Sequence, residues 1–131
     1  MAGGINYLER LNITLFELIS DLVRVFPEDG DFRIYLLASK TALAIDETFL
    51  YSVLTKKVMI YEDQILKKDE SFLLNFDIEK QVETSSQKTK EHVVSVIGKL
   101  RRVWTQVSPE NREVIWKYFR TMVLLHQKIT I

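Results

Sequence analysis

The sequence predicts an all-α fold, a single-domain bundle of five to six helices that spans residues 1–131. Only 4 Gly and 2 Pro occur among the 131 residues, so few positions interrupt a helix. Hydrophobic residues make up 47% of the chain and charged residues 27%, whereas disordered chains carry fewer apolar groups and more net charge. Apolar residues also recur at steps of three and four over most of the chain, which is typical of helices with one buried face.

The first two helices are expected on either side of a turn. The first covers residues 6–26 and ends before Pro27, because the residue before a proline avoids helical geometry. Residues 27–30 have the composition of a turn. The second helix is expected to begin at Asp31, a favourable N-cap residue, and to end near Ala44. Its small residues would permit close approach of another helix: Ala38, Ser39, Ala42 and Ala44.

The middle of the chain is expected to contain one long helix, one short helix and a polar loop. Asp46 is the N-cap candidate of the long helix, which would end near Lys68. Residues 69–71 could cap the short helix, which would end near Phe76. From 77 to 90 the chain turns polar, so we predict a loop or a frayed helix start there and regard it as the best candidate for mobility.

Two helices are expected in the last third of the chain. One spans about Thr89 to Gln106, and the other ends near Lys128. Ser108 and Pro109 mark the boundary between them, since serine caps helices and proline favours the first helical position. Apolar residues cover more than half the girth of the last helix. We therefore expect it to lie centrally in the bundle or to bury a second face against a partner.

Several classes of protein are excluded by composition. The chain contains no cysteine, so disulfides, Cys-ligated metal sites and a cysteine nucleophile are absent. The N-terminal residues lack the basic and apolar regions of a secretory signal. The longest apolar runs are far shorter than the roughly 20 residues of a membrane span. We expect a soluble intracellular protein that does not enter a membrane, located in the cytoplasm, the nucleus or a virion.

The sequence offers no catalytic, cofactor-binding or metal-binding signature. His92 and His126 lie on separate expected helices without an acidic or histidine residue four positions away. Residues 28–31 form an acidic turn, but the ligand spacing of a calcium loop is missing. The carboxylate pairs at 69–70 and 77–79 could support acid–base chemistry only if they converged, and helix capping explains them equally well. We predict no enzyme, no cofactor and no small-molecule substrate.

The neutral formal charge hides two opposed halves. Residues 1–79 contain 8 Lys or Arg against 14 Asp or Glu, a net charge of −6, and residues 80–131 contain 10 against 4, a net charge of +6. The basic half could bind nucleic acid, with Trp104, Trp116 and Tyr118 as stacking groups. Alternatively, the two halves cancel within the chain, or they attract each other between copies arranged head to tail.

We favour a non-enzymatic protein-interaction module over a nucleic-acid accessory protein. The last helix would dock an apolar partner surface, and an exposed tryptophan would mark the centre of that contact. We expect Trp104 to lie in the core and leave the placement of Trp116 open, because it shares less of the main apolar stripe. The residues predicted to bind a partner are Trp116, Arg112, Arg120, Arg101 and Arg102.

Three strings carry a resemblance to a known group of proteins. They are Asp21 to Asp29, Lys67 to Leu74, and Glu110 to Leu125 with its Ile-Trp-Lys-Tyr-Phe core. Over about residues 8–128 the chain resembles small all-helical proteins encoded by nucleocytoplasmic large DNA viruses that infect algae and protists. The resemblance implies a viral origin and a virion or infected-cell setting. It rests on aromatic residues, caps and charges, and it implies no functional residue.

Overall fold

The computed structural model describes residues 6–75 and 88–129, and side chains within 6–73 and 95–129. These residues form helices joined by turns and contain no strand, which confirms the predicted all-α bundle. Most of the loop predicted over 77–90 lies outside the described residues, but its last residues, from Lys88, already belong to a helix. The four long helices are α1 (Tyr7–Val25), α2 (Gly30–Ile45), α7 (Lys88–Val103) and α8 (Pro109–Lys128).

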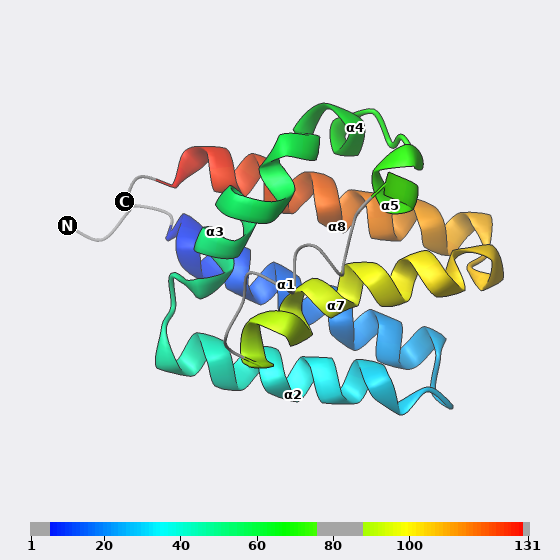
Figure 1. Cartoon of the computed structure of the whole chain (residues 1–131), viewed down its shortest axis with the longest axis horizontal. Coiled ribbons are helices and arrows are strands. Elements are labelled where there is room, and N and C mark those ends of the chain that lie inside the picture. Colours follow the sequence, from blue (N-terminus) through cyan, green and yellow to red (C-terminus); the bar gives the residue numbers. More distant parts are fainter. Residues whose placement is uncertain (1–5, 76–87, 130–131) are drawn as a thin grey trace.

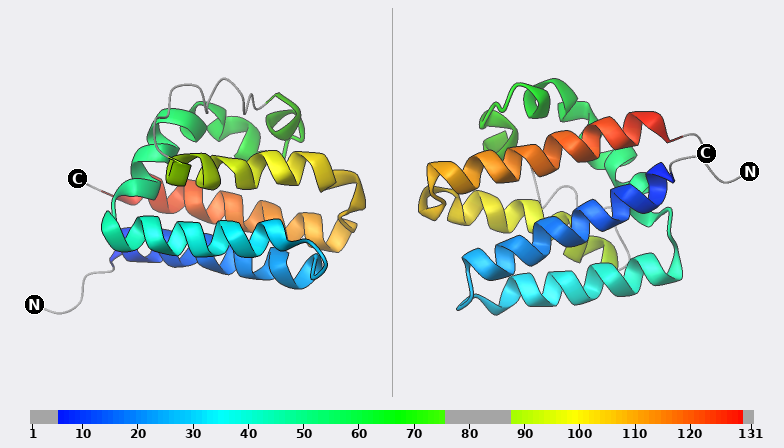
Figure 2. Two further views of the ribbon diagram at one scale, coloured as in Figure 1. Left: turned by 60° about the horizontal axis from the view of Figure 1, so that its bottom comes forward. Right: turned by 180° about the vertical axis from the view of Figure 1, so that it is seen from behind.

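Helix α1 lies between α2 and α8. Seen from behind, α8, α1 and α2 lie side by side in one layer, with α1 in the middle (Figure 2). Helix α7 packs against α2, and a segment of short helices packs against α7 and α8. Both lie on the face of the layer that is turned towards the viewer in Figure 1. That segment contains α3 (Phe49–Val53), a π-helix (Leu54–Val58), a 3₁₀ turn (Met59–Tyr61), α4 (Glu62–Leu66) and α5 (Ser71–Asn75).

The ends of α1 and α8 follow the signals in the sequence. The Asn6 side chain accepts a hydrogen bond from the Glu9 N–H at 3.0 Å and caps α1. Ser108 caps α8 by accepting from the Asn111 N–H at 3.2 Å, and Pro109 occupies the first helical position. Such caps satisfy N–H groups that have no partner within the helix. The predicted boundary at 108–109 is therefore confirmed.

The start of α2 differs from the prediction by two residues. Asp29, not Asp31, is the N-cap, and its carboxylate accepts a hydrogen bond from the Asp31 N–H at 3.0 Å. Because glycine is tolerated near helix starts, Gly30 can already be helical and Asp31 falls in the first turn. The acidic turn therefore supplies both the cap and a carboxylate that favours the positive end of the helix dipole.

The prediction of a single long helix from Asp46 to Lys68 is wrong, because this stretch is divided into short helical pieces. The Thr55 hydroxyl donates to the Tyr51 carbonyl at 2.8 Å, an interaction that bends helices. The π-helix begins at Leu54, beside this hydrogen bond, and the 3₁₀ turn follows it. The β-branched residues of the stretch from Asp46 to Lys68 also lower its propensity to form a regular α-helix.

The core lies where all these elements meet. Phe72 of α5 is fully buried, and its ring lies 5.9 Å from that of Phe119 and 6.5 Å from that of Trp116. The ring of Tyr61 lies 5.3 Å from it on another side. Aromatic pairs at these separations add to the free energy gained by burial. Phe72 thus joins the short-helix segment to α8.

We predict that Phe72→Ala lowers the free energy of unfolding by about 3–5 kcal/mol, the usual cost of removing a fully buried phenylalanine side chain. Chemical denaturation followed by circular dichroism measures the loss. Ile60→Ala is the control, because Ile60 is 73% exposed and its truncation should cost less than about 0.5 kcal/mol. Equal costs for the two variants would contradict the described packing.

Candidate interaction surface

Arg112, predicted to bind a partner, instead closes the corner between α7 and α8. Its guanidinium donates to the backbone carbonyls of Trp104 at 2.7 Å and Val107 at 3.1 Å. It also lies 3.5 Å from the Glu70 carboxylate, which accepts a hydrogen bond from the Trp104 indole at 3.0 Å. A guanidinium with five donors in a plane suits such a convergence of acceptors. Arg112 therefore stabilises the fold and has few donors left for a partner.

Trp116, predicted to bind a partner and left open between the core and the surface, lies in the core. Trp116 is only 4% exposed, and its ring packs edge-on against those of Trp104 and Phe119, with centroids 5.8 Å apart in each case. Trp104 is also buried, as expected. The apolar residues that cover more than half the circumference of α8 are explained by its contacts with α1 and α4. The last helix therefore does not present a tryptophan to a partner.

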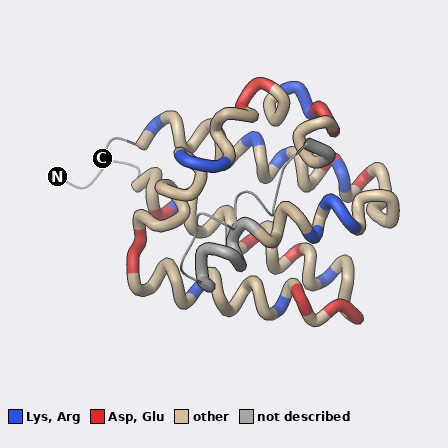
Figure 3. The backbone as a smooth tube through the Cα atoms, viewed as in Figure 1, with Lys and Arg blue, Asp and Glu red and all other residues tan. Residues whose placement is uncertain are grey.

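The other three predicted contact residues lie on the surface. Arg101 and Arg102 are exposed near the end of α7, and Arg120 is exposed on α8. Lys and Arg residues occur on every long helix, so the basic residues are distributed over several elements (Figure 3). This dispersion differs from the continuous basic stripe that is typical of nucleic-acid-binding proteins.

Lys99 joins the basic half of the chain to the acidic half. Its ammonium lies 2.6 Å from the Asp29 carboxylate and 3.0 Å from that of Asp31, and its side chain is only 15% exposed. Hydrogen bonds from Lys99 and from the Asp31 N–H hold the pKa of Asp29 below its usual range. The same two carboxylates raise the pKa of Lys99. Together with the Arg112–Glu70 pair, this contact shows that opposed charges meet within the chain.

The groups weighed for catalysis do not converge in the described residues. His126 stacks on Tyr51 at 4.4 Å and its Nε2 lies 2.7 Å from the Thr55 hydroxyl, while burial lowers its pKa. Asp69 accepts from the Ser71 N–H at 2.9 Å, as a cap does. No group of three or more potential metal ligands occurs there, and no described helix has the length and hydropathy of a membrane span. Asp77 and Glu79 lie outside the described residues, as does the side chain of His92.

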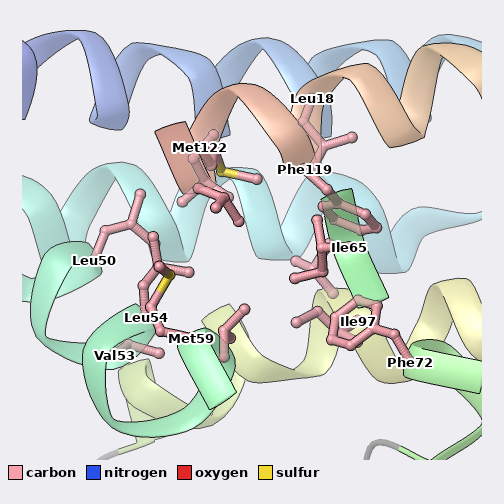
Figure 4. A pocket seen from close by; sticks show the side chains of 14 residues that line it. Leu18, Leu50, Val53, Leu54, Met59, Ile65, Phe72, Ile97, Phe119 and Met122 are labelled. Carbon is pink, nitrogen blue, oxygen red and sulfur yellow. The ribbon is translucent and has the colours of Figure 1, made fainter. Parts of the chain in front are cut away.

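A small apolar cavity lies in the core between α8 and the short-helix segment (Figure 4). Its volume is about 40 Å³, and aliphatic and aromatic side chains line it, among them Leu50, Val53, Met59, Phe72 and Val123. An apolar void of this kind offers no partners for water and reduces packing contacts. The cavity therefore represents imperfect packing of the irregular segment against the long helices.

The outer side of α2 is the most apolar exposed surface among the described residues. Ile34 is 54% exposed, Leu37 69% and Ile45 80%. Thr41 and Ala44 are also exposed, and the spacing of these five residues places them along one side of the helix. The opposite side of α2 contributes Phe32, Ser39 and Leu43 to the core. We call the exposed set the α2 outer stripe: Ile34, Leu37, Thr41, Ala44 and Ile45.

Sequence reasoning did not select the α2 outer stripe, although the signal was present. Residues 34–38 are all apolar, so the segment has no polar side facing solvent. Such a helix has to be buried on two sides or present an apolar surface. In the last helix, by contrast, the contacts with α1 and α4 account for the apolar residues.

Comparison of the chain with protein-family models, with curated proteins and with solved structures finds no match.

We predict that Lys99→Met lowers the free energy of unfolding by about 1–2 kcal/mol at pH 7, because two carboxylates lose their partner. The pKa of Asp29 is lower in the folded chain than in the unfolded chain. Ionised Asp29 therefore stabilises the fold at pH values above its unfolded pKa, and this stabilisation is lost as the pH falls through its folded pKa. The difference from wild type should therefore shrink below about pH 4. Urea denaturation at pH 7 and pH 3 measures it, and Lys117→Met on exposed α8 surface is the control. A difference independent of pH would count against the ion pair.

We also predict that Val123→Ile raises the free energy of unfolding by about 0.8 kcal/mol, since one methylene group enters the apolar cavity. Thermal denaturation provides the measurement. Val103→Ile is the matched control: Val103 is buried on α7 but does not line the cavity, so the added group should be neutral or destabilising. Stabilisation by both substitutions, or by neither, would contradict the assignment of free volume to this position.

Proposed function

We propose that the chain is a non-enzymatic protein-interaction module that binds an amphipathic helix through the α2 outer stripe. The observation that carries this proposal is the exposure of three large aliphatic side chains on a helix whose other side is buried. Contiguous apolar surface of this kind on a folded domain marks contact sites. Among the described residues weighed for catalysis or metal binding, Asp69 serves as a cap, His126 stacks on a ring and Asp29 forms an ion pair.

The spacing of the stripe favours a helical partner. Ile34, Leu37, Thr41 and Ala44 are separated by three, four and three residues, which is the a/d pattern of helices that pack side by side. Within a bundle this pattern normally faces inward, whereas here it faces outward on α2. The small residues Thr41 and Ala44 let another helix approach closely. An extended strand would not match this spacing, because its side chains alternate with a period of two.

The ion pairs within the chain count against the nucleic-acid alternative. Lys99 and Arg112 are held by carboxylates of the acidic half, so part of the basic charge is already neutralised. If the chain has the viral origin that its sequence resemblance implies, the partner would be a virion component or a host factor. The contact through α2 does not depend on that origin.

We predict that a photo-cross-linking amino acid at position 37 gives a discrete protein adduct in the cells that make this chain. The same group at position 117, exposed on α8, should give none. Ile34→Lys with Ile45→Lys in the same chain should abolish the adduct, because charged side chains then interrupt the apolar contact. Gel electrophoresis and mass spectrometry provide the readout. Adducts that are equal at both positions, or that survive the two lysines, would contradict the proposal.

A further inference from the structure

The α2 outer stripe is complementary to itself when it is reversed. Its N-terminal part carries the large residues Ile34 and Leu37, and its C-terminal part carries the small residues Thr41 and Ala44 before the stripe ends at Ile45. In an antiparallel pair centred on residue 39, Ile34 lies opposite Ala44 and Leu37 lies opposite Thr41. Large side chains then meet small ones, which fills the interface at close approach. A parallel pair would place large residues against large ones.

We propose, building on the function proposed above, that the helix bound by the stripe is α2 of a second copy of this chain. The two copies would be related by a two-fold axis that passes near residue 39 and would lie antiparallel. This is the isologous arrangement of most homodimers, in which the same surface serves both partners.

The charges at the two ends of α2 favour the same orientation. At the N-terminal end, Lys99 already pairs with Asp29 and Asp31, and Glu28 is exposed in the preceding turn, so only Arg33 favours this orientation. Arg33 is exposed there, and its guanidinium donates to the Pro27 carbonyl at 2.6 Å, with no carboxylate bound to it among the described residues.

At the C-terminal end of α2 the exposed charges are acidic: Asp46 and Glu47. Antiparallel pairing brings Arg33 of each copy to the acidic end of the other, whereas parallel pairing brings like charges together. Lys40, near the centre, lies over the Phe16 ring of α1, 5.9 Å from its centroid, and so is drawn away from the axis. Complementary charge of this kind fixes register and orientation more than it adds affinity.

The size of the surface sets the strength of the dimer. Sixteen residues of α2 span about 24 Å, and a single helix pair buries less than the roughly 800 Å² per partner of a standard interface. The dimer should therefore be weak and should depend on concentration. We expect a chain that is monomeric when dilute and dimeric when concentrated.

Sedimentation equilibrium of the purified full chain tests this inference. Up to about 1 mM chain, the apparent mass should rise from 15.4 kDa towards twice that value. Leu37→Lys should raise the dissociation constant at least about tenfold, because each interface contains the change twice. Leu124→Lys is the matched control, since Leu124 is an exposed leucine on α8 and its replacement should change nothing. Circular dichroism confirms that both variants fold.

The orientation has its own test. Arg33→Glu should weaken the dimer, and Arg33→Glu combined with Glu47→Arg should restore it, because the charges exchange ends. A wild-type chain that stays at 15.4 kDa throughout the series would overturn self-association, as would equal effects of Leu37→Lys and Leu124→Lys. If the cross-linked adduct at position 37 then has a mass other than that of two chains, the proposal of an interaction module is retained. Only the identification of the partner as a second copy is then wrong.

Discussion

The corner between α7 and α8 is the constraint on which the rest of the fold depends. Glu70 accepts from the Trp104 indole, and Arg112 donates to the Trp104 and Val107 carbonyls while it lies against Glu70. This network fixes how α8 leaves α7 and turns Trp116 towards Phe72 inside the bundle. Breaking a partly buried network of this kind leaves polar groups without partners, which costs more than the contacts themselves contribute.

The same constraint decides what the surface offers. Because the corner directs the aromatic side of α8 inward, the outer side of α8 is left with charged residues such as Lys117 and Arg120. Lys99 neutralises the acidic start of α2, and Arg112 contributes to the corner. Opposed charges are thus used within the chain, and three of the six large apolar residues that are exposed in the described part of the chain lie on α2: Ile34, Leu37 and Ile45. We attribute the interaction surface to α2 for this reason.

Much of the fold could be predicted from the sequence because its signals are local. Asn6 and Ser108 cap helices through their own side chains, and Pro109 fixes its own backbone angle. The division of residues 49–66 into short pieces could not be predicted, because a threonine hydrogen bond like that of Thr55 to Tyr51 also occurs in the unbroken helices α1 and α2. The inward direction of Trp116 depends on a distant residue, Phe72, and periodicity along one helix carries no information about that contact. The α2 outer stripe, in contrast, has a local signal in the apolar run over residues 34–38.

The distance between two copies of α2 tests the central claim most directly. The chain contains no cysteine, so a single introduced cysteine takes a spin label at one place only, and the exposed positions 40 and 28 leave the stripe and Arg33 intact. Pulsed electron paramagnetic resonance then measures the separation of the two labels. An antiparallel pair centred on residue 39 predicts a short separation at position 40 and a much longer one at position 28, because the N-terminal ends of the two α2 helices then lie at opposite ends of the pair. Equal short separations at both positions, or no coupling between copies, would contradict the account.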